Sequence, residues 1–146
     1  MKTAACSITL DEAPRPEDIA TVSDGLDAYN LEFAPPHGHR PLHIFLRAQD
    51  QRVVGGLIGG TAWGWLYVDR LWLAADQRRQ GYGTQLLAAA EEEARRRGCR
   101  HAHLDTLSFQ ALPFYERHGY SVWGVLEDLP PGHRRYFIKK ELTLPA

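Results

Sequence analysis

The feature that most limits the possible folds is a strand, a glycine-containing turn, a helix and a second strand, in that order, within residues 65–107. Apolar and polar side chains alternate over residues 65–73, which predicts the first strand. Residues 81–97 predict a helix, and residues 99–107 predict the second strand. The apolar stripe of the helix consists of Leu86, Leu87, Ala90 and Ala94. A strand–helix–strand unit of this kind indicates a mixed α/β fold built on one central sheet.

Further elements are predicted on both sides of this unit. Apolar runs bounded by turn residues predict strands at 5–11, 42–48, 52–63, 120–128 and 133–142. Helices are predicted at 16–33 and 110–118, and Gly25 is expected to weaken or divide the first of them. Four glycines within 52–63 are expected to mark bulges or close backbone approach. The chain of 146 residues is predicted to form a single α+β domain over 1–146, with six or seven strands and about four helices.

The charge balance of the chain excludes several classes of protein. Its formal net charge is −1, so no basic field is available to attract nucleic acid or a membrane surface. No apolar run approaches the ~20 residues of a membrane-spanning helix, and the first residues become polar too early for a secretory signal. Cys6 and Cys99 match no metal or redox spacing, which favours reduced thiols. We therefore expect a cytoplasmic protein without nucleic-acid or membrane partners, and a homodimer is compatible with the sequence.

The entrance of the predicted helix at 81–97 has an unusual charge pattern. Helix N-termini present unpaired N–H groups and a positive dipole end, so Asp and Glu commonly gather there. The stretch QRRQGYGTQLLAAA, residues 77–90, has no carboxylate, and its only charges are Arg78 and Arg79. Gly81 and Gly83 allow a sharp turn and the close approach of a ligand to free N–H groups. The alternative is a solvated helix start, but the missing carboxylates favour a phosphate or pyrophosphate ligand.

The motif Arg-x-x-Gly-x-Gly, formed by Arg78, Gly81 and Gly83, resembles the signature of the Gcn5-related N-acetyltransferase (GNAT) superfamily. The preceding LWLAADQ is similar to the fourth strand of that family, and LDTLSFQALPFYERHGY is similar to its fifth strand and the following helix. GHRRYFIKKEL is similar to its final strand. Residues 63–142 match well, whereas residues 1–60 match only in the order of their elements. The resemblance implies the GNAT fold and the transfer of an acetyl group from acetyl-CoA.

The resemblance also implies where coenzyme A binds. Backbone N–H groups around the motif hold the pyrophosphate in that family, and the corresponding residues here are Arg78, Arg79, Gln80, Gly81, Tyr82, Gly83 and Thr84. The strand before the motif pairs with the pantetheine arm, which corresponds to Leu71, Trp72 and Leu73. In many members a tyrosine protonates the leaving thiolate, and Tyr115 occupies that position. Ser108 replaces an asparagine often found seven residues earlier, and its hydroxyl has a shorter reach to the pantetheine.

Acetyl transfer to an amine requires a neutral nucleophile. A lysine-like amine with a pKa near 10.4 is mostly protonated at pH 7, and its deprotonation costs roughly 4.6 kcal/mol. Asp69 is the candidate base, because a carboxylate on a central strand is unusual unless it is paired or functional. Pairing with neighbours of Arg70 or capping a loop is the equal alternative, and many members of the family use a chain of waters instead. Glu32, Tyr67 and His39 are weaker candidates for the acceptor pocket.

Strict alternation along residues 65–73 assigns each side chain to a face of the sheet. One face is expected to carry Tyr67, Asp69, Leu71 and Leu73. The other face is expected to carry Leu66, Val68, Arg70 and Trp72.

His37, His39 and His43 do not predict a metal site, since they lie on a loop rich in proline and glycine with no cysteine nearby. The predicted activity is metal-free transfer of acetyl from acetyl-CoA to a primary amine of a small molecule or peptide, by direct attack in a ternary complex. Two alternatives remain, a non-catalytic acyl-CoA-binding module and a dimerisation domain with a vestigial loop. The acceptor is left open among polyamines, aminoglycoside-like drugs, amino acids and protein N-termini.

Overall fold

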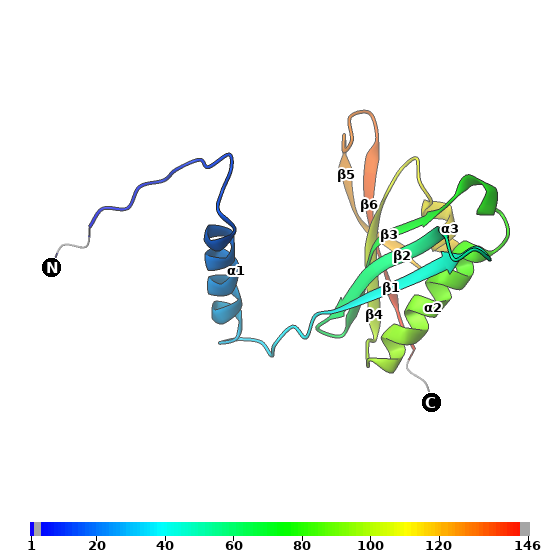
Figure 1. Cartoon of the computed structure of the whole chain (residues 1–146), viewed down its shortest axis with the longest axis horizontal. Helices are drawn as coiled ribbons and strands as arrows, with labels where there is room; N and C mark the ends of the chain where they lie inside the picture. Colours follow the sequence, from blue (N-terminus) through cyan, green and yellow to red (C-terminus); the bar gives the residue numbers. More distant parts are fainter. Residues whose placement is uncertain (2–3, 144–146) are drawn as a thin grey trace. The chain divides into compact units, whose positions relative to one another are not determined.

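The computed structural model describes residues 1 and 4–143 (Figure 1). Its contacts divide the chain into two compact units, Met1–Pro36 and His37–Ala146, and each is described by itself. The elements of the second unit are β1 (Arg40–Arg47), β2 (Val53–Ala62), β3 (Trp65–Leu73), α2 (Tyr82–Arg96), β4 (His101–Leu107), α3 (Leu112–Arg117), β5 (Ser121–Glu127) and β6 (Arg134–Glu141). A short 3₁₀ helix, Ala75–Gln77, precedes α2. These elements confirm the predicted order of strands and helices from residue 40 onward.

The first unit contains one helix, α1 (Pro16–Asn30). Pro16 stands in its first turn, where the missing N–H costs no hydrogen bond, and Glu17 and Asp18 complement the positive end of the helix dipole. The prediction that Gly25 weakens or divides this helix is wrong as regards division, because the helix is continuous through Gly25. Among the described residues there are thus three α-helices, against about four expected.

The strand predicted over residues 5–11 is wrong. These residues have no regular secondary structure, and the side chains of Ile8 and Leu10 are exposed. A strand is stable only when another backbone satisfies its N–H and C=O groups. In the part of the first unit that the structure describes, the only regular element is a helix, so this unit itself offers no partner strand. The described chain therefore has six strands.

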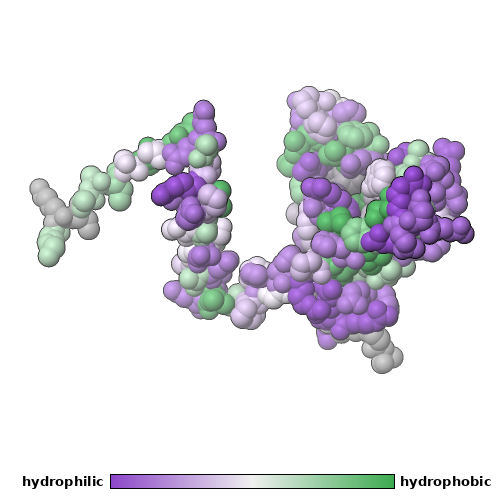
Figure 2. Space-filling view, viewed as in Figure 1, coloured by the Kyte–Doolittle hydropathy of each residue, from purple (hydrophilic) through white to green (hydrophobic). Residues whose placement is uncertain are grey.

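The second unit is a six-stranded sheet in the order β1-β2-β3-β4-β6-β5. Among the described strands β3 and β4 form the parallel pair, since α2 connects them, and the other neighbours are antiparallel. The β5–β6 hairpin extends beyond the other strands (Figure 1). Figure 2 shows hydrophobic residues gathered over this hairpin and over the middle of the sheet. Exposed apolar side chains of the hairpin strand β5 include Val122, Trp123, Val125 and Leu126.

Helix α2 packs against β1, β2 and β3 and forms most of the core with them. Its buried apolar side chains are Leu86, Leu87, Ala90 and Ala94, as the sequence predicts. Tyr115 of α3 and Tyr120 after it join the same core cluster. The packing therefore fixes the start of α2 and the short helix α3 relative to the sheet.

Candidate active site

A bulge in β3 decides which side chains face the site. Ile58 of β2 pairs with Arg70, and the next residue, Gly59, pairs with Val68, so Asp69 has no partner on β2. One extra residue on a bulged strand shifts the alternation of faces. At Gly59 a Cβ would lie 2.4 Å from the Tyr67 carbonyl oxygen, which confirms the predicted close backbone approach among the β2 glycines.

The bulge makes the predicted assignment of strand faces wrong beyond Asp69. Leu66 and Val68 are buried against the core, as strict alternation predicts. After the bulge, however, Leu71 and Leu73 pack against that same core, while Arg70 and Trp72 are exposed. Asp69 therefore lies where the alternation of core-facing side chains along β3 is interrupted.

Strands β3 and β4 separate at the same level. Their parallel pairing runs from Trp65 opposite His101 to Val68 opposite Leu104. Beyond this point β3 continues to pair with β2 and β4 continues to pair with β6. The two strands consequently diverge toward their carboxyl ends, where ligand sites of α/β sheets commonly form.

A cleft of about 560 Å³ lies at the ends of β3 and α3 and the start of α2, and we call it the α2 cleft. Its lining residues are Leu71, Trp72, Leu73, Arg78, Arg79, Gly81, Tyr82, Gly83, Thr84, Ala111, Phe114, Tyr115 and Arg117. All but one of the predicted coenzyme-binding residues at 78–84, and the three predicted on β3, lie here. The size suits a drug-sized ligand.

A second cavity of about 390 Å³ lies between the diverging strands, and we call it the β3–β4 cavity. Its lining residues are Val68, Asp69, Arg70, Leu71, Trp72, Leu104, Asp105, Thr106, Gln110, Ala111 and Tyr115. Leu71, Trp72, Ala111 and Tyr115 line both cavities. The predicted acid, Tyr115, and the predicted base, Asp69, thus both line the β3–β4 cavity.

The start of α2 forms the polar wall of the α2 cleft. Gly81 precedes the helix with φ 85°, a left-handed conformation that favours glycine, and the first turn contains no acidic residue. No side chain caps this helix end, so its first N–H groups remain available to a ligand. Arg78 is anchored by a hydrogen bond from its Nε to the carbonyl oxygen of Leu73, at 3.1 Å. This arrangement presents N–H groups and two guanidinium groups to an anion.

Tyr115 lies on α3, which begins with Pro113 in its first turn, as predicted. The side chain is 6% exposed, and burial raises the pKa of its hydroxyl to about 12. Tyr115 therefore stays protonated throughout the physiological pH range.

Thr84 at the start of α2 and His118 after α3 are joined at 3.1 Å between Oγ1 and Nε2. The two helices that border the α2 cleft are therefore linked directly.

The acidic side of the β3–β4 cavity contains Asp69 and Asp105. Asp69 is about half exposed, and its Oδ2 lies 3.6 Å from Nε of Arg70. Asp105 contacts Arg135 at 3.6 Å between Oδ1 and Nη1, and accepts a long hydrogen bond from the Tyr67 hydroxyl at 3.5 Å. Asp105 was not predicted from the sequence. The signal that could have found it is its alternation with His101 and His103 along one face of the predicted strand.

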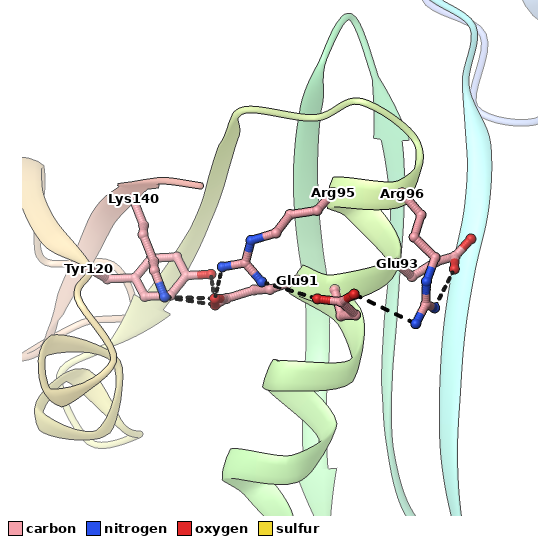
Figure 3. A network of polar contacts seen from close by, with 7 residues as sticks. Glu91, Glu93, Arg95, Arg96, Tyr120 and Lys140 are labelled. Atoms are coloured by element: carbon pink, nitrogen blue, oxygen red, sulfur yellow. Dashed lines mark hydrogen bonds and ion pairs between the residues drawn. The ribbon is translucent and has the colours of Figure 1, made fainter. Parts of the chain in front are cut away.

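A buried ion-pair network supports the region of Tyr115 (Figure 3). Glu91 of α2 is 4% exposed. Its carboxylate lies 2.6 Å from Lys140 Nζ, accepts a hydrogen bond from the Tyr120 hydroxyl at 3.3 Å, and lies 3.8 Å from Arg95 Nη2. The Tyr120 ring meets the Tyr115 ring at 5.7 Å and 77°. Glu91 thereby connects α2, β6 and Tyr120, which follows α3.

Five predicted site residues line neither cavity, namely Glu32, His39, Tyr67, Gln80 and Ser108. The Gln80 side chain donates to the carbonyl oxygen of Asp76, and Ser108 Oγ lies 3.3 Å from His133 Nδ1 and accepts from the Arg134 N–H. His39 lies beside Gly60 on β2, and Glu32 belongs to the first unit. Within residues 1 and 4–143, no group of three or more His, Cys, Asp or Glu side chains could hold a metal ion. No helix in the described part of the chain is long and apolar enough to cross a membrane.

The comparisons with known proteins agree with this geometry. The family model described as Acetyltransferase (GNAT) family matches residues 6–120. The chain belongs to the GNAT acetyltransferase family, which confirms the resemblance inferred from Arg78, Gly81 and Gly83. It is an acetyltransferase, and acetyltransferases of this family use acetyl-CoA.

Two curated relatives and one solved structure illustrate the similarity. The chain is 41% identical over 134 residues to acetyltransferase Atu2258 of Agrobacterium fabrum, covering 92% of this chain and 98% of the relative. It is 39% identical over 116 residues to blasticidin-S acetyltransferase of Streptomyces morookaense, covering 77% of this chain and 85% of the relative. A crystal structure of an acetyltransferase from Bacillus cereus matches with a TM-score of 0.84 and 31% identity, covering 92% of this chain and 98% of that structure's chain.

Proposed function

We propose that this acetyltransferase transfers an acetyl group from acetyl-CoA to a primary amine by direct attack in a ternary complex. The observation that carries the proposal is that Tyr115 lines both cavities. One cavity ends at the anion-binding start of α2, and the other contains two carboxylates. A donor and an acceptor bound on either side of Tyr115 could therefore meet without leaving the protein, as direct transfer requires.

In this proposal the α2 cleft binds acetyl-CoA. The N–H groups of residues 81–84, with Arg78 and Arg79, hold the pyrophosphate, because a helix start without acidic residues favours an anion. The exposed end of β3, Leu71 to Leu73, holds the pantetheine arm through its main chain. Gln80 and Ser108 are less favoured as coenzyme contacts, since neither lines the cleft and both have hydrogen bonds elsewhere.

The acceptor amine enters the β3–β4 cavity. Asp69, directly or through a water, takes a proton from the amine as its nitrogen attacks the thioester carbonyl carbon. The C–N bond forms, the C–S bond breaks, and Tyr115 donates a hydrogen bond and then a proton to the departing sulfur. The raised pKa of Tyr115 keeps that proton on the oxygen until negative charge develops on the sulfur.

The similarity to a blasticidin-S acetyltransferase suggests a first acceptor to test. We propose that blasticidin S or another small amine is acetylated in preference to a protein N-terminus. The cavity volume of about 390 Å³ favours a small molecule or a short extended segment. Tyr67 borders this side of the site through its contact with Asp105, and Glu32 and His39 stay sequence-based candidates for the acceptor pocket.

Two measurements test the proposed function. Coenzyme A should raise the midpoint of thermal unfolding by about 5–10 °C at a hundredfold excess over its Kd. Free thiol should then be released from acetyl-CoA when blasticidin S, polyamines, amino acids and a peptide N-terminus are supplied in turn. The absence of any shift with millimolar coenzyme A would refute the proposed cleft.

The same measurements separate the enzyme from a non-catalytic acyl-CoA-binding module. A module of that kind would show the thermal shift but would release no thiol with any amine. The buried Tyr115 between two cavities favours the enzyme, because a binding module has no need of a second cavity. A cytoplasmic location and a homodimer belong to the proposal on sequence grounds. Light scattering of the purified chain measures the oligomeric state.

A further inference from the structure

We infer that Asp105 selects acceptors that carry a positive charge in addition to the amine that reacts. This inference rests on the proposed function and extends it to the class of acceptor. Asp105 lies on β4 and lines the same cavity as Asp69 and Tyr115. It is a specificity-determining residue of the acceptor side, distinct from the base and from the proton donor.

Asp105 is held in place from two sides. Arg135 on the neighbouring strand β6 contacts Oδ1 at 3.6 Å, and the Tyr67 hydroxyl contacts Oδ2 at 3.5 Å. The side chain is 26% exposed, so it is screened less than a surface carboxylate. A carboxylate oxygen accepts more than one hydrogen bond, so both oxygens retain capacity for a donor in the cavity. A preorganised carboxylate loses little entropy when it binds a cation.

The charges that line the cavity leave an excess of negative charge. The lining contains two carboxylates, Asp69 and Asp105, and one cationic side chain, Arg70. Arg70 is 80% exposed and adjoins Asp69. Arg135 partly neutralises Asp105 but does not belong to the lining.

Tyr67 and His103 lie beside the same carboxylates. Burial, followed by the charges of Asp105 and Asp69, raises the pKa of the Tyr67 hydroxyl, and Arg135 opposes this shift. His103, whose ring lies 5.0 Å from that of Tyr67, has its pKa lowered by burial and so adds no positive charge near pH 7. The lining of the cavity therefore carries more negative than positive charge.

The reacting amine cannot be the cation that Asp105 binds. That nitrogen must be neutral when it attacks, and its charge is removed before the C–N bond forms. A second ammonium or guanidinium group keeps its charge throughout the reaction. Asp105 consequently favours diamines, polyamines and guanidino-amines over amines of the same length that end in a neutral group.

The test compares two acceptors of equal length, 1,5-diaminopentane and 5-amino-1-pentanol, with acetyl-CoA as donor. The wild-type chain should have the higher kcat/KM for the diamine, and 0.5 M NaCl should reduce that preference. In Asp105→Asn the ratio of kcat/KM for the diamine to that for the amino alcohol should fall about tenfold, because the KM of the diamine rises. A tenfold change corresponds to the loss of one charge-assisted hydrogen bond. The KM of the amino alcohol should stay within about twofold of the wild-type value. The thermal shift with coenzyme A should stay within a few degrees of the wild-type shift.

Two further variants keep the result interpretable. Asp105→Glu retains the charge and should retain most of the preference. Glu127→Gln removes a carboxylate that also pairs with an arginine of β6, Arg134, but lines neither cavity, so it should change nothing. Equal kcat/KM for the two acceptors, an unchanged preference in Asp105→Asn, or no acetylation of either amine by a chain that binds coenzyme A would overturn the inference. Failure to bind coenzyme A would instead overturn the proposed function.

Discussion

At the scale of single residues, the burial of Tyr115 defines what it can do. Burial of the ring in the core raises the pKa of its hydroxyl to about 12. A phenol of this kind is a weaker acid than tyrosine in water. It acts as a hydrogen-bond donor that strengthens as negative charge builds on its acceptor, which is the property that a leaving thiolate needs.

Tyr115→Phe should therefore slow the reaction without impairing coenzyme binding. We expect kcat to fall about 10²-fold, since a positioned acid commonly contributes 10²–10⁴-fold, while the thermal shift with coenzyme A is retained. Thiol release under saturating acetyl-CoA measures the effect. The wild-type rate should not fall between pH 7 and pH 10, because the raised pKa keeps Tyr115 protonated there. A variant as fast as wild type would remove Tyr115 from the chemistry.

Gly81 is the residue whose replacement should abolish coenzyme binding. Gly81→Glu places a side chain and a negative charge beside the start of α2, where the pyrophosphate is proposed to bind. Gly64→Glu is the matched control, because Gly64 also has positive φ and open space around it but lies in the β2–β3 turn. Both variants should lose roughly 1 kcal/mol of stability from left-handed strain. Only Gly81→Glu should lose the thermal shift, and a normal shift in that variant would contradict the site.

At the scale of elements, the sequence predicts what local periodicity controls. The helix predicted over 81–97 and its apolar stripe follow from residue spacing and agree with the observed helix, Tyr82–Arg96. The position of the bulge at Asp69 does not follow from residue spacing, because it depends on how β2 pairs with β3. The segment 5–11 has the composition of a strand, but strand formation also requires a neighbour that composition does not reveal.

The α2 helix contains a second feature that periodicity does not reveal. Glu91 and Glu92 look alike in the sequence, each four residues before an arginine. The structure buries Glu91 against Lys140, Tyr120 and Arg95, whereas Glu92 is half exposed and pairs only with arginines of its own helix. Buried and exposed ion pairs differ greatly in what their disruption costs.

Glu91→Gln should therefore destabilise the fold much more than Glu92→Gln. Loss of the charge leaves Lys140, which is 22% exposed, without its counter-ion. We expect a loss of about 2–3 kcal/mol for Glu91→Gln and less than about 0.5 kcal/mol for Glu92→Gln. Urea denaturation followed by circular dichroism measures both. Equal losses for the two variants would show that the buried network contributes no more than a surface pair.

At the scale of the whole molecule, position along the chain groups most residues of the α2 cleft, but it does not group the two carboxylates of the β3–β4 cavity. The residues from Arg78 to Thr84 are contiguous, so their shared role is visible in the sequence. Asp69 and Asp105 belong to strands that are separated by α2 along the chain and become neighbours only through the order of the sheet. Side chains on different strands converge by topology, and a single sequence does not specify that convergence.

The stability of the whole chain should fall in strongly alkaline solution because of its buried tyrosines. Burial raises the pKa of Tyr115 to about 12 from 10.0, and burial together with the Glu91 charge raises that of Tyr120 further. Below pH 10 both hydroxyls are protonated in the folded and the unfolded chain, so they add no pH dependence. Above pH 10 the unfolded tyrosines release protons that the folded ones retain, so the free energy of unfolding decreases as pH rises through 12.

Each buried tyrosine should contribute roughly 1.4 kcal/mol of this loss per pH unit between its unfolded and folded pKa. Urea denaturation at pH 8 to 11 measures the slope for the wild type and for Tyr115→Phe and Tyr120→Phe. Each substitution should lower stability at pH 8 but reduce the slope above pH 10, because one linked proton is removed. Tyr29→Phe, which removes an exposed hydroxyl of α1, serves as the control. An unaltered slope in both core variants would mean that the enclosed hydroxyls titrate as they do in water.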